Sequence, residues 1–335
     1  MNKKLLLTAA GAFIIVALLS LIVAIAWFMN PSEQGPARID TDFTRINTVG
    51  WQDSVFISPD GNELYFAYMP YTQKTFMDLF FGRITEEDVV RRGPERPGNH
   101  GSMSFDTYVA ARKGDGSWGT PANLNINSDH QLYSAKISFD GKELYYAIRD
   151  YDKNYGADDI YYSRKMPDGS WSPPENLGHN INTQYREDHP ALSPDGQTLY
   201  FTRSRQEMLG IEIWAAKRVE GGWSKAVKLP EPVNQPNAFS KANHQPFMAA
   251  GGRTLYFTRM WKLHKSTLLD DGSWSEPEVV LPGLEVSGHA SVTADGRRLY
   301  YITAKEHEAF IRHEWVVVYS EKREDGSWGE PIYVD

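Results

Sequence analysis

The stretch "HPALSPDGQTLYFTRS" (189–204) decides the fold of this chain, because close variants of it occur four more times. In every copy two apolar segments flank a short turn with glycine, and in four copies the turn holds Asp-Gly. Short segments rich in β-branched and aromatic residues, separated by such a turn, indicate a β-hairpin. Asp-Gly in a two-residue hairpin loop predicts a type I′ turn, in which both central residues have positive φ. The other copies lie at 54–68, 134–148, 245–259 and 289–303.

A second motif alternates with the first and sets the period of the repeat. It is a glycine-containing turn followed by tryptophan, and in four of five copies a proline lies three residues later. Proline has no N–H to donate to a sheet, so it suits the outer edge strand of a blade. Five periods of about 50 residues, each with four strand segments, predict an all-β, five-bladed β-propeller of four-stranded antiparallel blades. The tryptophans are Trp118, Trp171, Trp223, Trp274 and Trp328.

The phrase Ser-Pro-Asp-Gly-x-x-Leu-Tyr-Phe, with Asp or His shortly before it, resembles the TolB-type, WD40-like β-propeller repeat of bacterial envelope proteins. The resemblance covers residues 45–335 and also implies a propeller. The copies depart from the family at Gly251, where the family has Asp, and at Thr293-Ala294, where it has Ser-Pro. The family includes binding platforms as well as enzyme-associated propellers, so the resemblance implies a fold and leaves the function open.

The N-terminus reads as a membrane anchor. Lys3 and Lys4 precede an uncharged, apolar run over residues 5–29, which as a helix would be about 37 Å long and would span a bilayer core of about 30 Å. The lysines favour a cytoplasmic tip at residues 1–4. We therefore expect a single-pass protein of the inner (cytoplasmic) membrane with a periplasmic or extracellular C-terminal domain. The alternative is a signal peptide cleaved after Ala24-Ile25-Ala26, although the run exceeds the usual apolar length of such peptides.

Two further segments flank or interrupt the predicted propeller, which spans residues 45–335. Residues 30–44 contain Pro and Gly among polar residues and read as a linker. Residues 37–43 in it are a candidate latch that would add to the last strand and close the ring. Residues 69–103 form a long insert in blade one, between its second and third strands. A lid, a partner contact, a membrane contact and simple core packing are all open for this insert.

Composition excludes several function classes. The net charge is −8, whereas a general nucleic-acid binder usually carries a basic stripe. The chain has no cysteine, which excludes disulfides and thiolate chemistry. It also lacks the G-x-S-x-G, H-E-x-x-H and phosphate-loop motifs of common hydrolases, metalloproteases and nucleotide-binding proteins.

Two candidate metal sites stand out. Asp150, Asp152 and Asn154 have a D-x-D-x-N spacing that suits Ca²⁺, although Gly156 comes one place late for an EF-hand loop; a solvated acidic loop is the alternative. The second site comes from the residues six or seven places before each hairpin turn, where the inner strands begin at the rim of the channel. They include three histidines on different blades, His189, His244 and His289, which would suit a transition metal.

The resemblance adds one point on the histidines, since TolB-type lyases that act on acidic sugars use a His-rich metal site. No motif is matched residue by residue, so no role is carried over. Polar residues that line a water-filled channel are the simpler interpretation. The rim positions are Asp53, Ser54, Tyr133, Ser134, Asp188, His189, His244, Gln245, Gly288 and His289.

Other residues suit a glycan ligand. Two carboxyl groups about 5–9.5 Å apart suffice for glycoside hydrolysis, and the candidates are Asp53 as base or nucleophile, Glu187 as acid, and Asp188. Three arginines that end or follow second strands are candidates to bind a carboxylate or sulfate, unless they pair with nearby acids; they are Arg149, Arg203 and Arg259. Trp51 and Trp261 are candidates to stack on a sugar ring.

The sequence therefore favours a non-catalytic binding platform that faces the periplasm and engages an envelope protein or a glycan. A glycan-active enzyme in the central funnel, either a glycoside hydrolase or a metal-dependent polysaccharide lyase, is the alternative. Ca²⁺ is the candidate cofactor of the loop at residues 150–154, and a transition metal is that of the three histidines.

Overall fold

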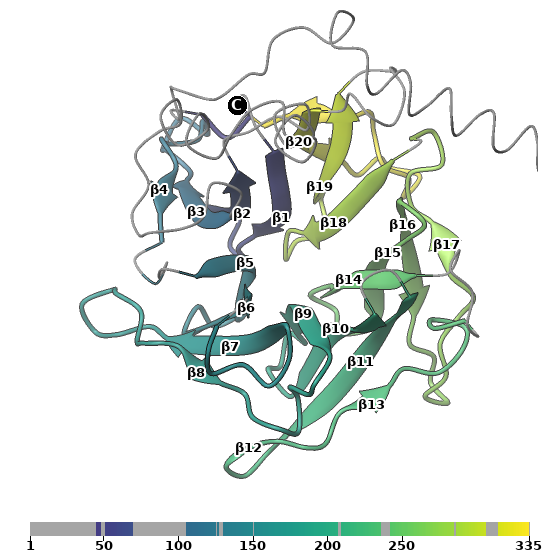
Figure 1. The fold of residues 1–335 in the computed structure, drawn as a ribbon. Coiled ribbons are helices and arrows are strands. Elements are labelled where there is room, and N and C mark those ends of the chain that lie inside the picture. Colours follow the sequence, from purple (N-terminus) through teal and green to yellow (C-terminus); the bar gives the residue numbers. More distant parts are fainter. Residues whose placement is uncertain are drawn as a thin grey trace, which may run out of the picture. The chain divides into compact units, whose positions relative to one another are not determined.

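The repeat folds into five antiparallel blades arranged in a ring (Figure 1), four with four strands and one, blade three, with a short fifth strand. The computed structural model describes residues 45–47, 51–69, 105–124, 126, 130–149, 151–206, 209–235, 242–284, 286–305 and 314–334. The expected anchor at 5–29, the linker and latch at 30–44, and nearly all of the insert lie outside these residues. Within them, no helix is long and apolar enough to cross a membrane.

In each blade the strands follow one another from the channel outward, all antiparallel. Blade one comprises β1 (Trp51–Ile57), β2 (Glu63–Met69), β3 (Asp106–Ala111) and β4 (Ala122–Asn123). Blade two comprises β5 (Gln131–Ile137), β6 (Glu143–Arg149), β7 (Asp158–Arg164) and β8 (Glu175–Asn176). Blade three comprises β9 (Arg186–Leu192), β10 (Thr198–Gln206), β11 (Leu209–Val219), β12 (Gly222–Trp223) and β13 (Val227–Lys228).

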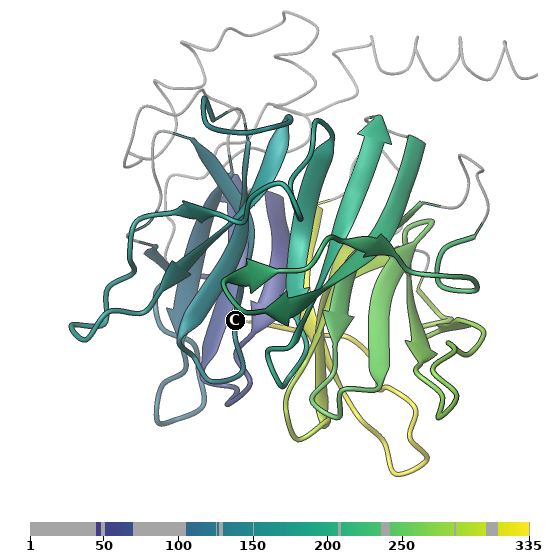
Figure 2. The same ribbon diagram turned by 90° about the horizontal axis from the view of Figure 1, so that it is seen from below.

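Blade four comprises β14 (Asn243–Met248), β15 (Thr254–Arg259), β16 (Lys262–Thr267) and β17 (Glu278–Val279), and blade five comprises β18 (Ser287–Val292), β19 (Arg298–Lys305), β20 (Glu314–Glu321) and β21 (Ile332–Tyr333). In the side view the inner strands run between the two faces of the ring (Figure 2). The predicted five-bladed propeller is confirmed. The predicted edge prolines directly precede the short outer strands β4, β8, β17 and β21.

The second strands supply the core between blades. In the Leu-Tyr-Phe segment of β2 all three side chains, Leu64, Tyr65 and Phe66, are buried, and the equivalent segments of the other blades pack in the same way. A strand that is apolar on both faces is stable only between two apolar neighbours, because roughly 25 cal/mol is gained for each Å² of apolar surface removed from water. The ring supplies those neighbours on both sides of every blade.

The hairpin turns differ from the predicted type I′ geometry. Gly61 has a φ of 76°, but Asp60 before it is not among the residues with positive φ. The Gly61 N–H donates to the Ser58 carbonyl at 2.9 Å, and the Ser58 hydroxyl donates to the Asp60 carboxylate at 2.5 Å. The same Ser/Thr-to-Asp bond recurs in blades two, three and five. The type I′ prediction was wrong because the loop between β1 and β2 spans residues 58–62 and is therefore longer than the two-residue loop of a type I′ turn. Blade four has the same turn, with positive φ at Gly252, without this side-chain bond.

A type I′ turn does occur, at a place the sequence did not mark. Met260 and Trp261 form the two-residue loop between β15 and β16, with φ values of 49° and 63°. Neither residue is Gly, Asn or Asp, the types that tolerate this conformation at low cost. The turn therefore holds two bulky side chains in a strained backbone.

An asparagine side chain joins neighbouring blades, and the sequence did not indicate this role. Asn182 accepts from the Ile160 N–H at 2.8 Å and donates to the Ile160 carbonyl at 2.9 Å, so it pairs with β7 as a short strand would. Asn234 makes the same two bonds to Ile213 in β11. Each asparagine follows a buried Ile or Val, which anchors the connection between blades in the core.

The same device closes the ring. Asn47 accepts from the Val317 N–H at 2.8 Å and donates to the Val317 carbonyl at 2.7 Å and the Val334 carbonyl at 2.8 Å. These bonds join the described residues before blade one to the last two strands of blade five. The proposed latch at 37–43 lies outside the described residues, whereas residues 45–47 make the described contacts.

One lysine spans the central channel. Lys136 in β5 donates from Nζ to the Pro246 carbonyl in β14 at 2.7 Å, although blades two and four are not neighbours in the ring. Only 7% of Lys136 is exposed, and burial lowers the pKa of its ammonium to about 7. The side chain therefore crosses the channel and links blades two and four.

Asn47→Ala should lower the free energy of unfolding by about 2 kcal/mol, because it leaves the buried N–H and carbonyl of Val317 without partners. Urea unfolding at one pH measures this. Asn182→Ala should have a similar effect. Asn62→Ala is the control, because Asn62 is exposed and its side chain bonds only within its own turn. Equal stability of the Asn47 and Asn62 variants would contradict the clamp.

Lys136→Met should change how stability depends on pH. In the native chain the folded state releases the Lys136 proton near pH 7, whereas the unfolded state keeps it until about pH 10. The unfolded state then binds more protons in that window, so native stability should rise with pH. Between pH 7 and 9 the native chain should gain about 2 kcal/mol relative to the Met variant, measured by urea unfolding. Parallel curves would rule out a lowered Lys136 pKa.

Candidate functional site

Each inner strand carries a β-bulge that aims side chains at the channel. Two inner-strand residues lie opposite one residue of the second strand, as the register shift between Asp53 and Phe56 in β1 shows. The first residue of each bulge has a φ between 49° and 60°, although none is glycine. An L-residue in this region costs about 1–2 kcal/mol. The five residues are Ser54, Ser134, His189, Gln245 and His289.

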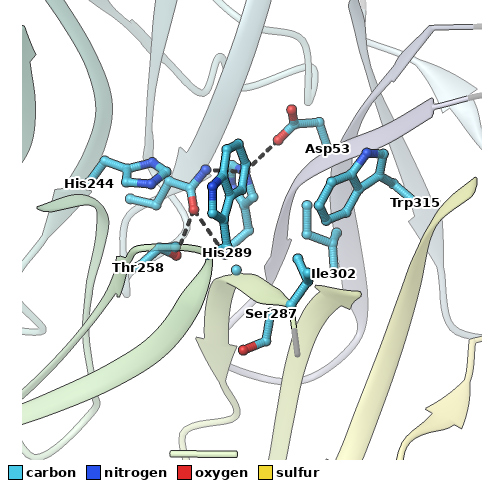
Figure 3. Close-up of a pocket in the computed structure, with 11 residues that line it drawn as sticks. Asp53, His244, Thr258, Ser287, His289, Ile302 and Trp315 are labelled. Atoms are coloured by element: carbon cyan, nitrogen blue, oxygen red, sulfur yellow. Dashed lines mark hydrogen bonds and ion pairs between the residues drawn. The ribbon is translucent and has the colours of Figure 1, made fainter. Parts of the chain in front are cut away.

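Three side chains from these bulges converge on the axis. One potential ligand atom each from Asp53, His189 and His289 lies within 4.8 Å of the other two, and we call these residues the axial group. The His289 Nε2 lies 2.6 Å from Asp53 Oδ1, as Figure 3 shows for the labelled pair. His244 lies beside the group, with its ring centroid 6.4 Å from that of His189. The predicted His189–His244–His289 trio thus meets, and Asp53 joins two of its members.

Asp188 orients His189. Its Oδ1 lies 2.7 Å from His189 Nδ1, which directs the other ring nitrogen, Nε2, elsewhere. The Asp188 Oδ2 lies 2.8 Å from Arg186 Nε in an ion pair, although this N–H makes no directed hydrogen bond. Arg186 also pairs with Asp158, which accepts from the Tyr133 hydroxyl at 2.7 Å. Asp188 is therefore held in place behind His189. The sequence did not indicate that Arg186 and Asp158 support it.

The protonation states make the site electron-rich. Burial raises the pKa of Asp53, but His289 and His189 outweigh burial and lower the pKa to about 2. Burial likewise opposes ionisation of Asp188, yet His189 and Arg186 hold its pKa well below its usual range. Burial lowers the pKa of His289, and burial with the neighbouring histidines lowers the pKa of His244 to about 3. At neutral pH two carboxylates therefore face two neutral imidazoles, an arrangement that favours a cation.

The two neighbours of His289 Nε2 require opposite protonation states of that nitrogen. Besides Asp53 it contacts the Gln245 Nε2. That amide is oriented because its Oε1 accepts from the Thr258 hydroxyl at 2.7 Å and from the His289 N–H at 3.3 Å. A ring nitrogen that accepts from the amide opposes the carboxylate, and one that donates to the carboxylate opposes the amide N–H. Protons alone therefore leave one of these contacts unfavourable.

Glu187, the proposed acid, is engaged elsewhere. Its carboxylate accepts from the Thr183 N–H at 2.9 Å, the Thr183 hydroxyl at 2.6 Å and Arg203 Nε at 2.6 Å. The residue is 0% exposed, and burial raises its pKa while Thr183 and Arg203 oppose that rise. Glu187 thus acts as the cross-strand partner of Arg203. It is not among the residues that line the pocket beside the axial group, which is described below.

The three candidate arginines are also held by neighbours. Arg149 pairs with Asp158 at 2.9 Å, and Arg259 donates to the Asn243 side chain at 2.6 Å and the Val233 carbonyl at 2.7 Å. Together with the Arg203–Glu187 pair, these contacts follow from position, since each arginine lies in a second strand opposite a polar side chain of an adjacent strand. The arginines hold the rim together rather than presenting a shared anion site.

The proposed calcium loop has a different role for Asn154. Its Nδ2 donates to the Ile148 carbonyl at 2.9 Å, and its Oδ1 accepts from the Tyr161 hydroxyl at 2.9 Å. Asp152 is exposed, and Asp150 lies outside the described residues. Glycine is required at position 156 for a steric reason, because a Cβ there would lie 1.8 Å from the Tyr185 carbonyl oxygen. The loop is therefore closed by Asn154, and the calcium site remains a prediction without support from these contacts.

A pocket opens beside the axial group, between blades four and five (Figure 3). It exists because Gly288 has no side chain where the other blades place Asp53, Tyr133, Asp188 and His244; a Cβ at Gly288 would lie 3.1 Å from Gln245 Oε1. The pocket has a volume of about 70 Å³.

Two tryptophans line the mouth of this pocket. Trp261 is 44% exposed, and its ring centroid lies 6.4 Å from that of Trp315, with an angle of 30° between the planes. Trp315 comes from β20 and was not anticipated, because nothing in the local sequence distinguishes it from a core tryptophan. The side chain of Trp51, the other stacking candidate, lies outside the described residues.

No family model matches the chain, and no curated protein sequence matches it. Solved structures share its fold at low identity. A thermostable family-43 glycoside hydrolase has a TM-score of 0.50 at 14% identity, covering 87% of this chain and 97% of that chain. A protein described as a TolB from Agrobacterium tumefaciens has a TM-score of 0.47 at 14% identity, covering 90% of each chain.

TolB from Acinetobacter baumannii has a TM-score of 0.45 at 13% identity, covering 80% of this chain and 65% of that chain. At these identities the similarity concerns the propeller fold alone.

Proposed function

We propose that this chain is an exported, membrane-anchored propeller that binds an envelope protein or glycan at its channel mouth, and that the axial group holds a divalent transition-metal ion there. The observation that carries the proposal is the convergence of Asp53, His189 and His289, one potential ligand atom from each, within 4.8 Å. The apolar run over residues 5–29 supports export and anchoring.

The donor set suits the proposed ion. Two imidazoles and one carboxylate form a ligand set that zinc and iron proteins use, with further positions left for water or a ligand. Metal-bound histidines are usually oriented by a carboxylate on the other ring nitrogen, and Asp188 occupies that position for His189. An ion shared by Asp53 and His289 would also remove the opposition between their lone pairs.

The chemistry of the described pocket favours binding over glycoside hydrolysis. A glycosidase needs one protonated carboxyl group as general acid and one ionised carboxylate. Asp53 and Asp188 both have lowered pKa values. Glu187, whose pKa is raised, is buried against Arg203. Among the described residues that line the pocket, none supplies the acid.

The metal site predicts stoichiometric binding. The full-length chain in detergent, stripped with a chelator, should bind one Zn²⁺ or Mn²⁺ by titration calorimetry. Asp53→Asn and His289→Gln should each weaken binding at least tenfold, because each removes one of three protein ligands. His179→Gln is the matched control, since His179 is an exposed histidine away from the axis. Binding that all three variants retain equally would overturn the assignment.

A metal-dependent lyase is the second candidate, and His244 is the observation that favours it. This imidazole lines the pocket beside the axial group, and its pKa is lowered to about 3, so it is neutral at physiological pH. It would act as a base only if a bound ligand raised that pKa. The metal-loaded chain should then release unsaturated products from uronate oligosaccharides, followed by ultraviolet absorbance. His244→Ala should abolish turnover and keep the metal. If no uronate oligosaccharide yields a product, the lyase is excluded and the binding platform remains the proposed function.

A further inference from the structure

We infer that the pocket between blades four and five is a subsite for one neutral pyranose ring, which stacks at the tryptophan mouth and inserts a hydroxyl-bearing edge past Gly288. The inference rests on the proposed function, because it names the class of ligand bound beside the axial group. Four independent features of the described residues support it.

The first feature is the strained turn that carries Trp261. Met260 and Trp261 both have positive φ, at a cost of about 1–3 kcal/mol each. The turn is nevertheless fixed, because the Trp261 carbonyl accepts from the Ser287 N–H of blade five at 2.7 Å. Asn-Gly would relieve the strain and would lose the indole. The chain thus retains strain at the one place where it holds a large exposed ring over the pocket.

The second feature is the aromatic mouth itself. An indole face carries negative potential and packs against the weakly positive C–H face of a pyranose. Trp261 is 44% exposed, and the Trp315 ring lies 6.4 Å from it with an angle of 30° between the planes. The exposed indole face of Trp261 suits the flat face of a sugar, and Trp315 adds a second aromatic ring to the pocket wall.

The third feature is the mixture of groups inside the pocket. Ile302 and Val286 form apolar wall, while Thr258, Gln245 and Asp53 offer hydroxyl, amide and carboxylate groups. A pyranose has the same mixture, with C–H faces and hydroxyl edges. The pocket volume of about 70 Å³ is well above the roughly 10–15 Å³ that one water molecule needs, so the pocket has room for the hydroxyl-bearing edge of a sugar ring.

The fourth feature is charge. Asp53 lines the pocket and Asp188 lies behind the neighbouring His189, and no lysine or arginine is among the described lining residues. A uronate would meet the negative charge of Asp53 there, whereas a neutral sugar would not be repelled. Asp188 adds little to this charge, because Arg186 pairs with it at 2.8 Å. The metal-free site should therefore select neutral sugars.

Calorimetry with the full-length chain in detergent tests the subsite. The probes are glucose, galactose, mannose and N-acetylglucosamine, a neutral tetrasaccharide of each, and galacturonate oligomers, each with and without Zn²⁺. At least one neutral sugar should bind the metal-free chain at least tenfold more tightly than galacturonate oligomers. If the natural ligand is a free sugar, the monosaccharide and its tetrasaccharide should bind with equal affinity. If it is a glycan chain, the tetrasaccharide should bind more tightly.

Two variants separate the subsite from the metal site. Trp261→Ala should weaken sugar binding at least tenfold and leave Zn²⁺ binding unchanged, and Tyr333→Ala is the control as an exposed aromatic residue on outer strand β21. Gly288→Ala should also weaken sugar binding, because its Cβ enters the pocket. If no sugar of the panel binds, or if Trp261→Ala binds as the native chain does, the subsite is overturned. Loss of Zn²⁺ binding in His189→Gln with sugar binding intact would support the subsite independently of the metal, because His189 belongs to the axial group and is not among the residues that line the pocket.

Discussion

Five non-glycine residues held at positive φ control what this propeller presents to its channel. The first position of such a bulge is where glycine relieves strain, yet the chain places Ser, Ser, His, Gln and His there. Because a left-handed residue turns its side chain out of the regular alternation, each bulge points a functional group and its predecessor toward the axis. Without the bulges, His189 and His289 would not converge with Asp53 from three different strands.

The rest of the fold offsets the free-energy cost of this backbone strain. Second strands buried on both faces give a continuous apolar core, and asparagine side chains bond the connections between blades to the third strand of the preceding blade. Asn47 repeats this bond where the ring closes, so the closure uses a device already present between other blades. A closed ring resists the outward relaxation that five strained inner strands would otherwise allow.

The sequence predicted what depends on local pattern and missed what depends on distant partners. Hairpin motifs at a regular period gave the blade number, and counting back from each turn located the rim residues, because hairpin register is local. The type I′ assignment failed because the strands end earlier than the motif suggests, which leaves a loop at 58–62 that is longer than two residues. The expected role of Glu187 found no support because Arg203 lies across the strand, and Trp315 was missed because its neighbour Trp261 is more than fifty residues away.

The axial group and the tryptophan pocket share one residue, and this has a consequence for ligand choice. Asp53 belongs to the axial group and also lines the pocket. Its negative charge repels an acidic sugar when no ion is present, whereas a divalent ion beside it would reverse the local sign and attract the same sugar. One pocket would then recognise neutral or acidic glycans according to metal supply, with the aromatic mouth common to both. Gly288 makes this coupling direct, because no side chain separates the two sites at that position.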